Sequence, residues 1–312
     1  MRATPDAAAT RHAPQPEAPG GAKRGGEGPA HPARTHPTPD RASGAAPERP
    51  GPGVRRFGRT NWLGLWTLIG REVRRFAKVW GQTLLAPLAT AALFMAVFHF
   101  ALAERRGDAM GVPFIDFLAP GIAMMTVIQN AFANTSSSLM IAKIQGSIVD
   151  TLMPPLSSAE ILTGYALGGV ARGAAVGLAV CAPVFLALGI VPAHPFWALL
   201  FILLGALAMA LAGLIAGVFC TKFDQMAAIT NFVVTPLAFL SGTFYSISDL
   251  PGLVYGLSHA NPVFYLIDGF RYGIIGVSDS PPLLSAGVAL ASCAALWLWA
   301  LRLITRGTGL KN

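Results

Sequence analysis

The chain has 312 residues, of which 53% are hydrophobic and only 12% are charged, and its mean hydropathy is +0.54. Soluble domains carry about 25% charged residues, so this composition excludes an ordinary cytosolic enzyme. The formal net charge of +8 does not indicate a nucleic-acid partner, because residues 1–59 alone hold ten basic and five acidic residues and the rest of the chain is close to balance.

Residues 1–56 form a basic tail rich in proline, glycine and alanine. No Leu, Ile, Val, Phe, Tyr or Trp occurs before Val54, so nothing apolar is available for burial to offset the conformational entropy of the tail. We expect the tail to be disordered, either as a tether to anionic lipid or a partner, or as a dispensable extension. The membrane domain is expected to comprise residues 57–312.

Long charge-free runs predict six transmembrane helices, because about 20 apolar residues are needed to cross the hydrocarbon core of a bilayer. The predicted spans are 84–103, 114–134, 161–189, 196–219, 227–246 and 283–302. Basic residues gather on one side of this arrangement, which places both chain ends in the cytoplasm by the positive-inside rule. The predicted fold class is therefore an all-α membrane protein.

Residues 61–80, before the first span, predict an amphipathic helix that lies in the membrane interface. Tryptophans such as Trp62 and Trp66 recur at helical spacing on its apolar stripe, whereas basic residues such as Arg74 and Arg75 lie largely off that stripe. This combination is typical of helices in the headgroup region. The alternative is that the helix packs on another protein surface.

Residues 135–160 join the second and third spans and include a segment too polar and too short to cross a membrane. An apolar stripe predicts a cytoplasmic amphipathic helix here, and its members are Ile141, Ile144, Ile148 and Leu152. Asp150 lies on the polar side, Pro154 and Pro155 end the helix, and a serine followed by Glu160 can cap the next one. The residues alone leave open whether this helix docks a partner or is an ordinary connection.

Arg172 lies well inside a predicted span, about one-third of the way along the third. A charge at this depth is costly, so its side chain should face the bundle interior or a cavity, as a substrate contact or in a salt bridge. The alternative is that it snorkels to the cytoplasmic interface. Glycines at four-residue spacing allow close helix approach around it, and they are Gly164, Gly168, Gly169, Gly173 and Gly177.

Residues 247–279 follow the fifth span on the outer side and carry two short apolar pieces, neither long enough to cross. They predict a re-entrant hairpin, whose backbone must be covered by protein or water. Asn261 and Pro262 lie between the two pieces. Asp268 and Arg271 are three residues apart and can pair across one helical turn.

No motif for covalent chemistry or nucleotide binding is present. A P-loop G-x-x-x-x-G-K-[ST] is absent, so this chain is expected to bind no ATP and to hold no cofactor or metal. Carboxylates within the spans are nearly absent, which weighs against an ion-coupled secondary transporter. A membrane-embedded lipid-modifying enzyme is the other alternative, and its only candidate cluster is Asp249, His259 and Asp268 on the outer side.

Three segments carry a family resemblance, and they are Pro154–Glu160 (PPLSSAE), Pro236–Tyr245 (PLAFLSGTFY) and Asn261–Gly273 (NPVFYLIDGFRYG). Together with the six-helix layout, they resemble the ABC-2 type permeases over roughly residues 60–305. These permeases are the membrane subunits of ATP-binding-cassette exporters. The long tail departs from the short N-terminus that is usual in that family.

The resemblance implies a dimer of six-helix halves, preferably a homodimer, in which each half engages a separate ATPase that binds ATP and magnesium. It implies that residues 139–152 form the coupling helix that contacts the ATPase, and that the outer hairpin caps the translocation path. The expected function is outward movement of an amphipathic, lipid-linked or glycan substrate or a drug. The expected place is a bacterial plasma membrane, with lipids as further partners and no nucleic acid.

Overall fold

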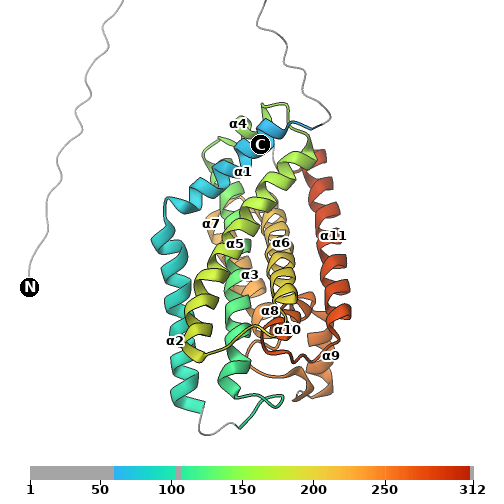
Figure 1. Ribbon diagram of the computed structural model, residues 1–312. Coiled ribbons are helices and arrows are strands. Elements are labelled where there is room, and N and C mark those ends of the chain that lie inside the picture. Colours follow the sequence, from blue (N-terminus) through green and yellow to red (C-terminus); the bar gives the residue numbers. More distant parts are fainter. Residues whose placement is uncertain (1–59, 103–106, 250, 310–312) are drawn as a thin grey trace, which may run out of the picture. The chain divides into compact units, whose positions relative to one another are not determined.

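The computed structural model describes residues 60–102, 107–249 and 251–309, which form helices and connecting segments with no strand among them (Figure 1). The predicted tail, residues 1–56, lies outside the described residues. The all-α class is confirmed for the described part. Five of its helices are long and apolar enough to cross a membrane, and they are Gly81–Ala101, Phe114–Ile144, Ser158–Leu188, Pro195–Phe219 and Pro282–Arg306.

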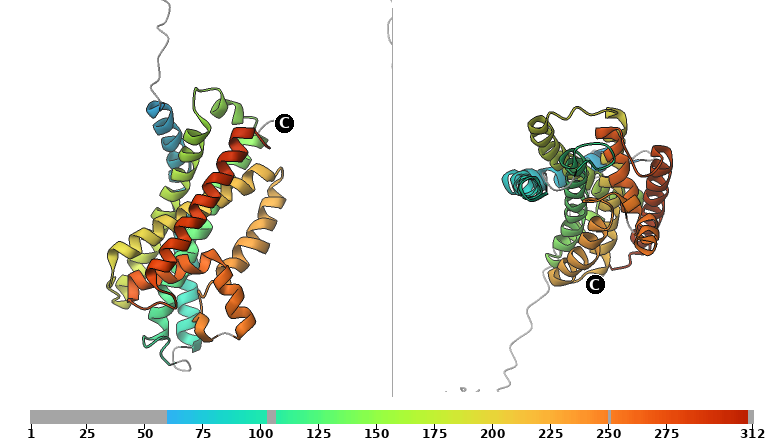
Figure 2. Two further views of the ribbon diagram at one scale, coloured as in Figure 1. Left: turned by 90° about the vertical axis from the view of Figure 1, so that its right-hand side faces the viewer. Right: turned by 90° about the horizontal axis from the view of Figure 1, so that it is seen from below.

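Two of the long helices, α3 (Phe114–Ile144) and α6 (Pro195–Phe219), form the centre of the bundle. In the most apolar stretch of each of these two helices, more than 70% of the residues are buried. In the corresponding stretch of Gly81–Ala101, which includes most of α2 (Ala86–Leu102), only 6% of the residues are buried. The helices α5 (Ser158–Leu188) and α11 (Pro282–Arg306) pack against this centre from different sides (Figures 1 and 2). Most of α2 is therefore not covered by the described part of the chain.

The helix α1 (Trp62–Ala77) lies across the start of α5, and small residues let the two backbones approach. A Cβ atom added at Gly164 would lie 2.4 Å from Leu68 Cδ2, and one added at Gly168 would lie 2.5 Å from Glu72 Cβ. Both distances are far inside van der Waals contact, so only glycine fits at these two positions. The close approach expected of the glycine repeat is thus observed between α1 and α5.

The predicted fifth span, 227–246, is wrong in its bounds. The helical run begins at Phe223 and ends at Phe239, as α7 (Phe223–Ile229), a π-helical segment (Thr230–Val234) and α8 (Thr235–Phe239). At 1.5 Å per residue this run spans about 26 Å, less than the hydrocarbon core of about 30 Å. The π segment lies just before Pro236, whose nitrogen cannot donate a helical hydrogen bond.

Two helices follow in the region predicted as an outer hairpin, α9 (Gly252–Ala260) and α10 (Pro262–Ile275). They meet at Asn261, as the sequence predicts. The helix α10 packs against α3, α6 and α11 and buries most of its side chains. Its backbone is therefore covered by protein, which is the condition for non-spanning helices at membrane depth.

Candidate functional site

The segment 139–152, predicted to form the coupling helix, is divided between two helices, so the prediction of one continuous helix is wrong. The helix α3 continues to Ile144, and α4 covers only Ile148–Leu152. Between them Gly146 adopts a positive φ of 70°, a left-handed conformation that ends a helix and that glycine adopts without strain. Ile141 therefore lies on a different helix from Leu152, and the four apolar residues form no single stripe.

The residues of α4 have two different environments. Ile148 is 8% exposed and packs in an apolar cluster with Leu139 and Ile161. In contrast, Val149, Leu152 and Met153 are 53%, 39% and 76% exposed. We call these three residues the loop tip; together with the exposed Asp150 they present the surface of this segment that a partner can reach.

Glu160 connects the loop to α1 as well as to α5. Its Oε1 atom accepts the backbone N–H of Asn61 at 2.5 Å, and its Oε2 atom accepts the N–H of Ser157 at 2.6 Å. Ser157 Oγ accepts the N–H of Glu160 at 3.3 Å, which completes a capping box. Asn61 in turn caps α1 through the N–H of Gly64 and donates from Nδ2 to the carbonyl of Pro155. The predicted cap is confirmed, and the same carboxylate holds the start of two helices.

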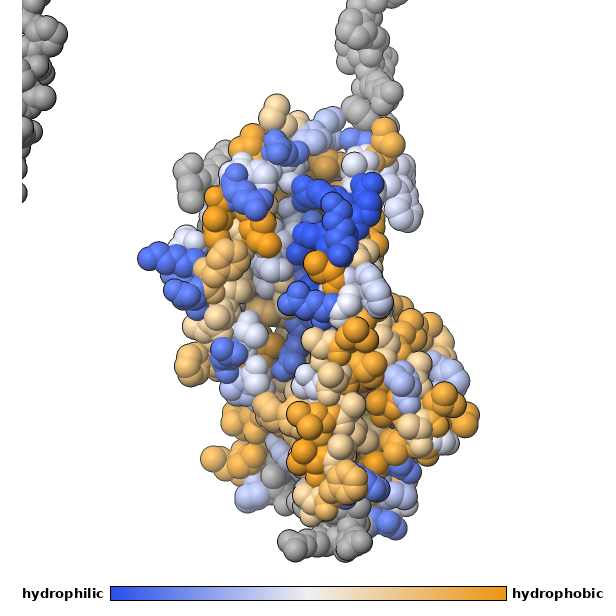
Figure 3. All heavy atoms as spheres, turned by 90° about the vertical axis from the view of Figure 1, so that its left-hand side faces the viewer, coloured by the Kyte–Doolittle hydropathy of each residue, from blue (hydrophilic) through white to orange (hydrophobic). Residues whose placement is uncertain are grey.

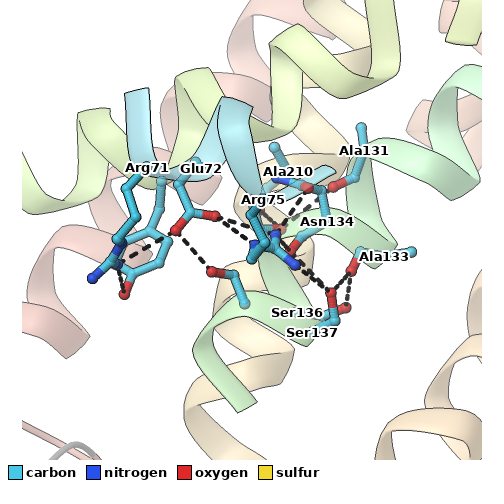
Figure 4. A network of polar contacts seen from close by, with 12 residues as sticks. Arg71, Glu72, Arg75, Ala131, Ala133, Asn134, Ser136, Ser137 and Ala210 are labelled. Atoms are coloured by element: carbon cyan, nitrogen blue, oxygen red, sulfur yellow. Dashed lines mark hydrogen bonds and ion pairs between the residues drawn. The ribbon is translucent and has the colours of Figure 1, made fainter. Parts of the chain in front are cut away.

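A buried polar network joins α1 to α3 at the same end of the bundle (Figure 4). Glu72 is 1% exposed and accepts hydrogen bonds from Arg75 at 3.2 Å and from Ser138 Oγ at 2.9 Å. Arg75 also donates to the backbone carbonyl and the Oδ1 atom of Asn134, at 2.8 and 2.9 Å. The arginine therefore faces the bundle rather than the surroundings, although the sequence pattern places it off the apolar stripe.

Arg71 extends this network to α4 and α5. Its guanidinium donates to Thr151 Oγ1 at 2.9 Å and to the hydroxyl of Tyr165 at 3.0 Å. Because Thr151 lies on α4 and Tyr165 on α5, one side chain of α1 links both. A hydrogen-bonded connection therefore runs from α4 through Arg71 to α1.

A cavity of about 630 Å³ opens beside this network, between α2, α3 and α5. Its walls include polar residues from all three helices and the short segment before α2, and they are Gln82, Thr83, Thr90, Thr126, Gln129, Asn130, Ser137 and Arg172. Arg172 Nη2 donates to Asn130 Oδ1 at 3.3 Å, whereas its buried Nε atom has no partner. The arginine thus lines a cavity. This is one of the two positions expected for it, since the sequence predicts that its side chain faces the bundle interior or a cavity.

Asp268 and Arg271 form a buried ion pair, as their spacing predicts. The charged atoms approach to 3.9 Å, and both side chains are 0% exposed. Asp268 accepts the N–H groups of Asp279 and Ser280, at 2.8 and 3.0 Å. Arg271 donates to the carbonyl of Gly242 at 2.6 Å and lies over the ring of Phe117. This pair joins α10 to α3 and to the segments after α8 and before α11.

Asn261 fastens the same region through its side chain. Its Oδ1 atom accepts the N–H of Val263 at the start of α10, and its Nδ2 atom donates to the carbonyl of Leu237 and to Ser241 Oγ. Pro262 occupies the first position of α10, where a missing N–H costs nothing. These residues hold the hairpin in place and bring no reactive groups together.

The residues of α1 that were predicted to lie in the membrane interface are exposed. Trp62 and Trp66 are 64% and 65% exposed and Arg74 also faces outward, while Leu65 and Leu68 pack inward. Glu72, which forms ion pairs with Arg71 and Arg75, was not among the predicted site residues. The available signal was that Glu72 is the one acidic residue in 61–80, three positions before a basic one.

Comparison with known proteins gives consistent matches over most of the chain. A family model described as ABC-2 type transporter matches residues 64–275. The inner membrane transport permease YadH of Escherichia coli (strain K12) is 41% identical over 254 residues, which are 80% of this chain and 98% of that protein. Nodulation protein J of Sinorhizobium fredii is 26% identical over 244 residues, covering 74% of this chain and 85% of that protein.

Proposed function

The chain belongs to the ABC-2 type transporter family, and from this premise we propose that it is the permease subunit of an ATP-binding-cassette exporter. It is a membrane transport permease with several membrane-spanning helices. The exporter function carries the further expectation of a separate ATPase, which supplies ATP binding and hydrolysis. The observation that supports this proposal best is the exposed loop tip, which is fastened through Glu160 and Arg71 to two helices of the bundle.

The coupling that we propose begins at the loop tip. The ATPase contacts Val149, Leu152 and Met153, and its nucleotide-dependent movement displaces α4. Arg71 and Glu160 pass this displacement to α1 and to the start of α5. Since a ligand shifts a conformational equilibrium only by its differential affinity for the two states, the ATPase must bind the displaced loop more tightly in one nucleotide state.

The orientation in the membrane, the second subunit and the cargo belong to the same proposal. The end of the bundle that carries α1 and α4 faces the cytoplasm of a bacterial cell, together with both chain termini. A second copy of the chain, paired as a homodimer, completes the path beside the exposed α2, and lipid covers the rest. The cargo is an amphipathic, lipid-linked or glycan molecule or a drug, and no cofactor binds to this chain itself.

Charge at the loop tip provides the direct test. The double variant Val149→Asp with Met153→Asp should keep its melting temperature, because both side chains are exposed, yet fail to recover the ATPase in affinity purification. Ile148 is unsuitable for this test because its burial makes a charge there a folding defect. Val191→Asp, which charges an 82% exposed residue after α5, is the matched control and should recover the ATPase normally. Normal recovery by the double variant would overturn the coupling role of the loop tip.

A further inference from the structure

The cavity beside α2 combines a cation with the size of a ligand pocket. Its volume of about 630 Å³ lies within the range of small-molecule sites, which is about 300–1,000 Å³. Arg172 is the cation on its wall, fourteen residues after the start of α5 and so roughly 21 Å along that helix. The guanidinium is therefore held well away from the helix end.

The charge of Arg172 is not balanced by the described part of the chain. Among residues 60–102, 107–249 and 251–309, the ion pairs join Glu72 to Arg71 and Arg75, and Asp268 to Arg271. Arg172 has only the neutral amide oxygen of Asn130, and its Nε atom is buried without a partner. Arg172 is half-buried, and a cation at this depth without a counter-charge is unfavourable, so an anion in the cavity would complete its interactions.

The walls change character along the cavity. The helix α2 leads away from the corner with α1, and α3 returns toward that corner (Figure 1). Near the corner the walls combine the polar Thr83, Asn130 and Ser137 with the apolar Val79 and Ile141, whereas farther away they are formed mainly by apolar residues such as Phe94 and Ile122. On the face that Figure 3 presents, the largest group of hydrophilic side chains lies in the upper part, among apolar ones, and apolar side chains predominate in the lower part.

A phosphate group suits the polar end of this cavity. The guanidinium offers several donors in a fixed plane that match phosphate oxygens, and the side-chain amides of Gln129 and Asn130 add further N–H donors. The apolar end suits an acyl or prenyl chain. Apolar walls bordering a cationic polar pocket therefore match an amphiphile better than a free anion.

We propose that this cavity binds a phosphate-bearing amphiphile, with its headgroup on Arg172 and its chain along Phe94 and Ile122. Binding itself is independent of the function proposed above. The amphiphile could be the transported cargo or a lipid that stays in the cavity. Its assignment as cargo rests on the proposed exporter function. Either source presents the same phosphate to Arg172.

Lipid binding by the purified full-length chain tests the site. Native mass spectrometry in a neutral detergent would compare dioleoyl phosphatidic acid with dioleoylglycerol, which has the same chains and no phosphate. The parent protein should bind the phosphatidic acid about ten- to hundred-fold more tightly, the range expected of charge-assisted hydrogen bonds. Inorganic phosphate at millimolar concentration should not displace it, and full displacement would show a site for free phosphate and overturn the amphiphile.

Two variants attribute the preference to the cavity. Arg172→Gln should lose the preference about tenfold or more, while Arg302→Gln, which removes an exposed charge on α11, should change it less than twofold. Thr90→Trp, which fills part of the cavity and keeps Arg172, should weaken binding as well, so the test survives if Arg172→Gln fails to fold. Unchanged preference in a folded Arg172→Gln or Thr90→Trp protein would overturn the site.

A reconstituted assay separates cargo from resident lipid. The chain with its ATPase in phosphatidylcholine vesicles should move labelled phosphatidic acid outward only with ATP, and Arg172→Gln should abolish that movement. Binding without movement would identify a resident lipid and overturn the cargo assignment alone. Failure to recover any ATPase would overturn the exporter function and leave the binding result standing.

Discussion

Replacement of Glu72 by alanine should loosen α1 from the bundle. The carboxylate is 1% exposed and holds Arg75 at 3.2 Å and Ser138 at 2.9 Å. Alanine removes both acceptors and leaves a partly buried arginine without its counter-charge. The neighbouring Gly168, whose added Cβ would lie 2.5 Å from Glu72 Cβ, shows how closely α1 approaches α5 at this point.

The expected loss follows from the remaining partners of Arg75. Removal of one member of a buried ion pair costs about 3–5 kcal/mol. Arg75 is 29% exposed and keeps two acceptors on Asn134, so we expect a smaller loss of about 2 kcal/mol in the free energy of unfolding, below that range. For a domain of this size, the melting temperature should fall by roughly 4–8 °C.

Thermal denaturation of the purified protein in detergent measures this fall. Glu72→Gln, which keeps the acceptor for Ser138 and removes the charge, should fall by less than Glu72→Ala. Asp150→Asn removes an exposed carboxylate and should stay within about 2 °C of the parent. A Glu72→Ala protein that melts with the parent, or effects of Glu72→Ala and Arg75→Ala that simply add, would refute the argument, because residues in one network should be coupled.

Three further substitutions probe the other contacts. Asp268→Ala strands a fully buried Arg271 and two N–H groups, so we expect a loss of about 3–5 kcal/mol and little folded protein by size-exclusion chromatography; a monodisperse protein of parental melting temperature would contradict this. Gly168→Val should displace α1 and lower the melting temperature, and an unchanged value would show that α1 shifts freely. Glu160→Ala should cost about 1–2 kcal/mol and speed amide hydrogen exchange at Asn61 about tenfold, whereas unchanged exchange there would show that the bond to Glu160 protects nothing.

Much of the fold follows from patterns that sequence alone displays. Charge-free length located five long helices, and the three-residue spacing of Asp268 and Arg271 predicted their ion pair. The serine and glutamate after two prolines predicted the cap at Ser157. The ion pair and the cap could be predicted because their partners lie within one helical turn of each other. The long helices could be predicted because a whole segment is apolar.

The end of the second span was misplaced because polar residues were interpreted as the end of burial. The second span was predicted to end at residue 134 where the sequence turns polar, yet α3 continues to Ile144. Asn134, Thr135 and Ser138 are at most 5% exposed, because their polar groups bond to Arg75, to the carbonyl of Ala210 and to Glu72. Such partners lie on other helices, and a single sequence does not reveal them.

The fifth span was misplaced for a related reason. Its apolar run continues past Phe239, but the chain leaves the helix there and turns at Gly242, whose φ is 71°. The carbonyl of that glycine accepts Arg271, twenty-nine residues later. Hydropathy counts apolar residues and carries no information about this distant acceptor.

Affinity purification of the tagged chain from its native membrane in mild detergent, with mass spectrometry of the proteins that accompany it, tests the central claim most directly. The proposed permease function predicts a P-loop ATPase in about equal amount with this chain. Repeated recovery of the folded chain without such an ATPase, under conditions in which a known permease keeps its own, would contradict the claim that this protein is the membrane subunit of an ATP-driven exporter.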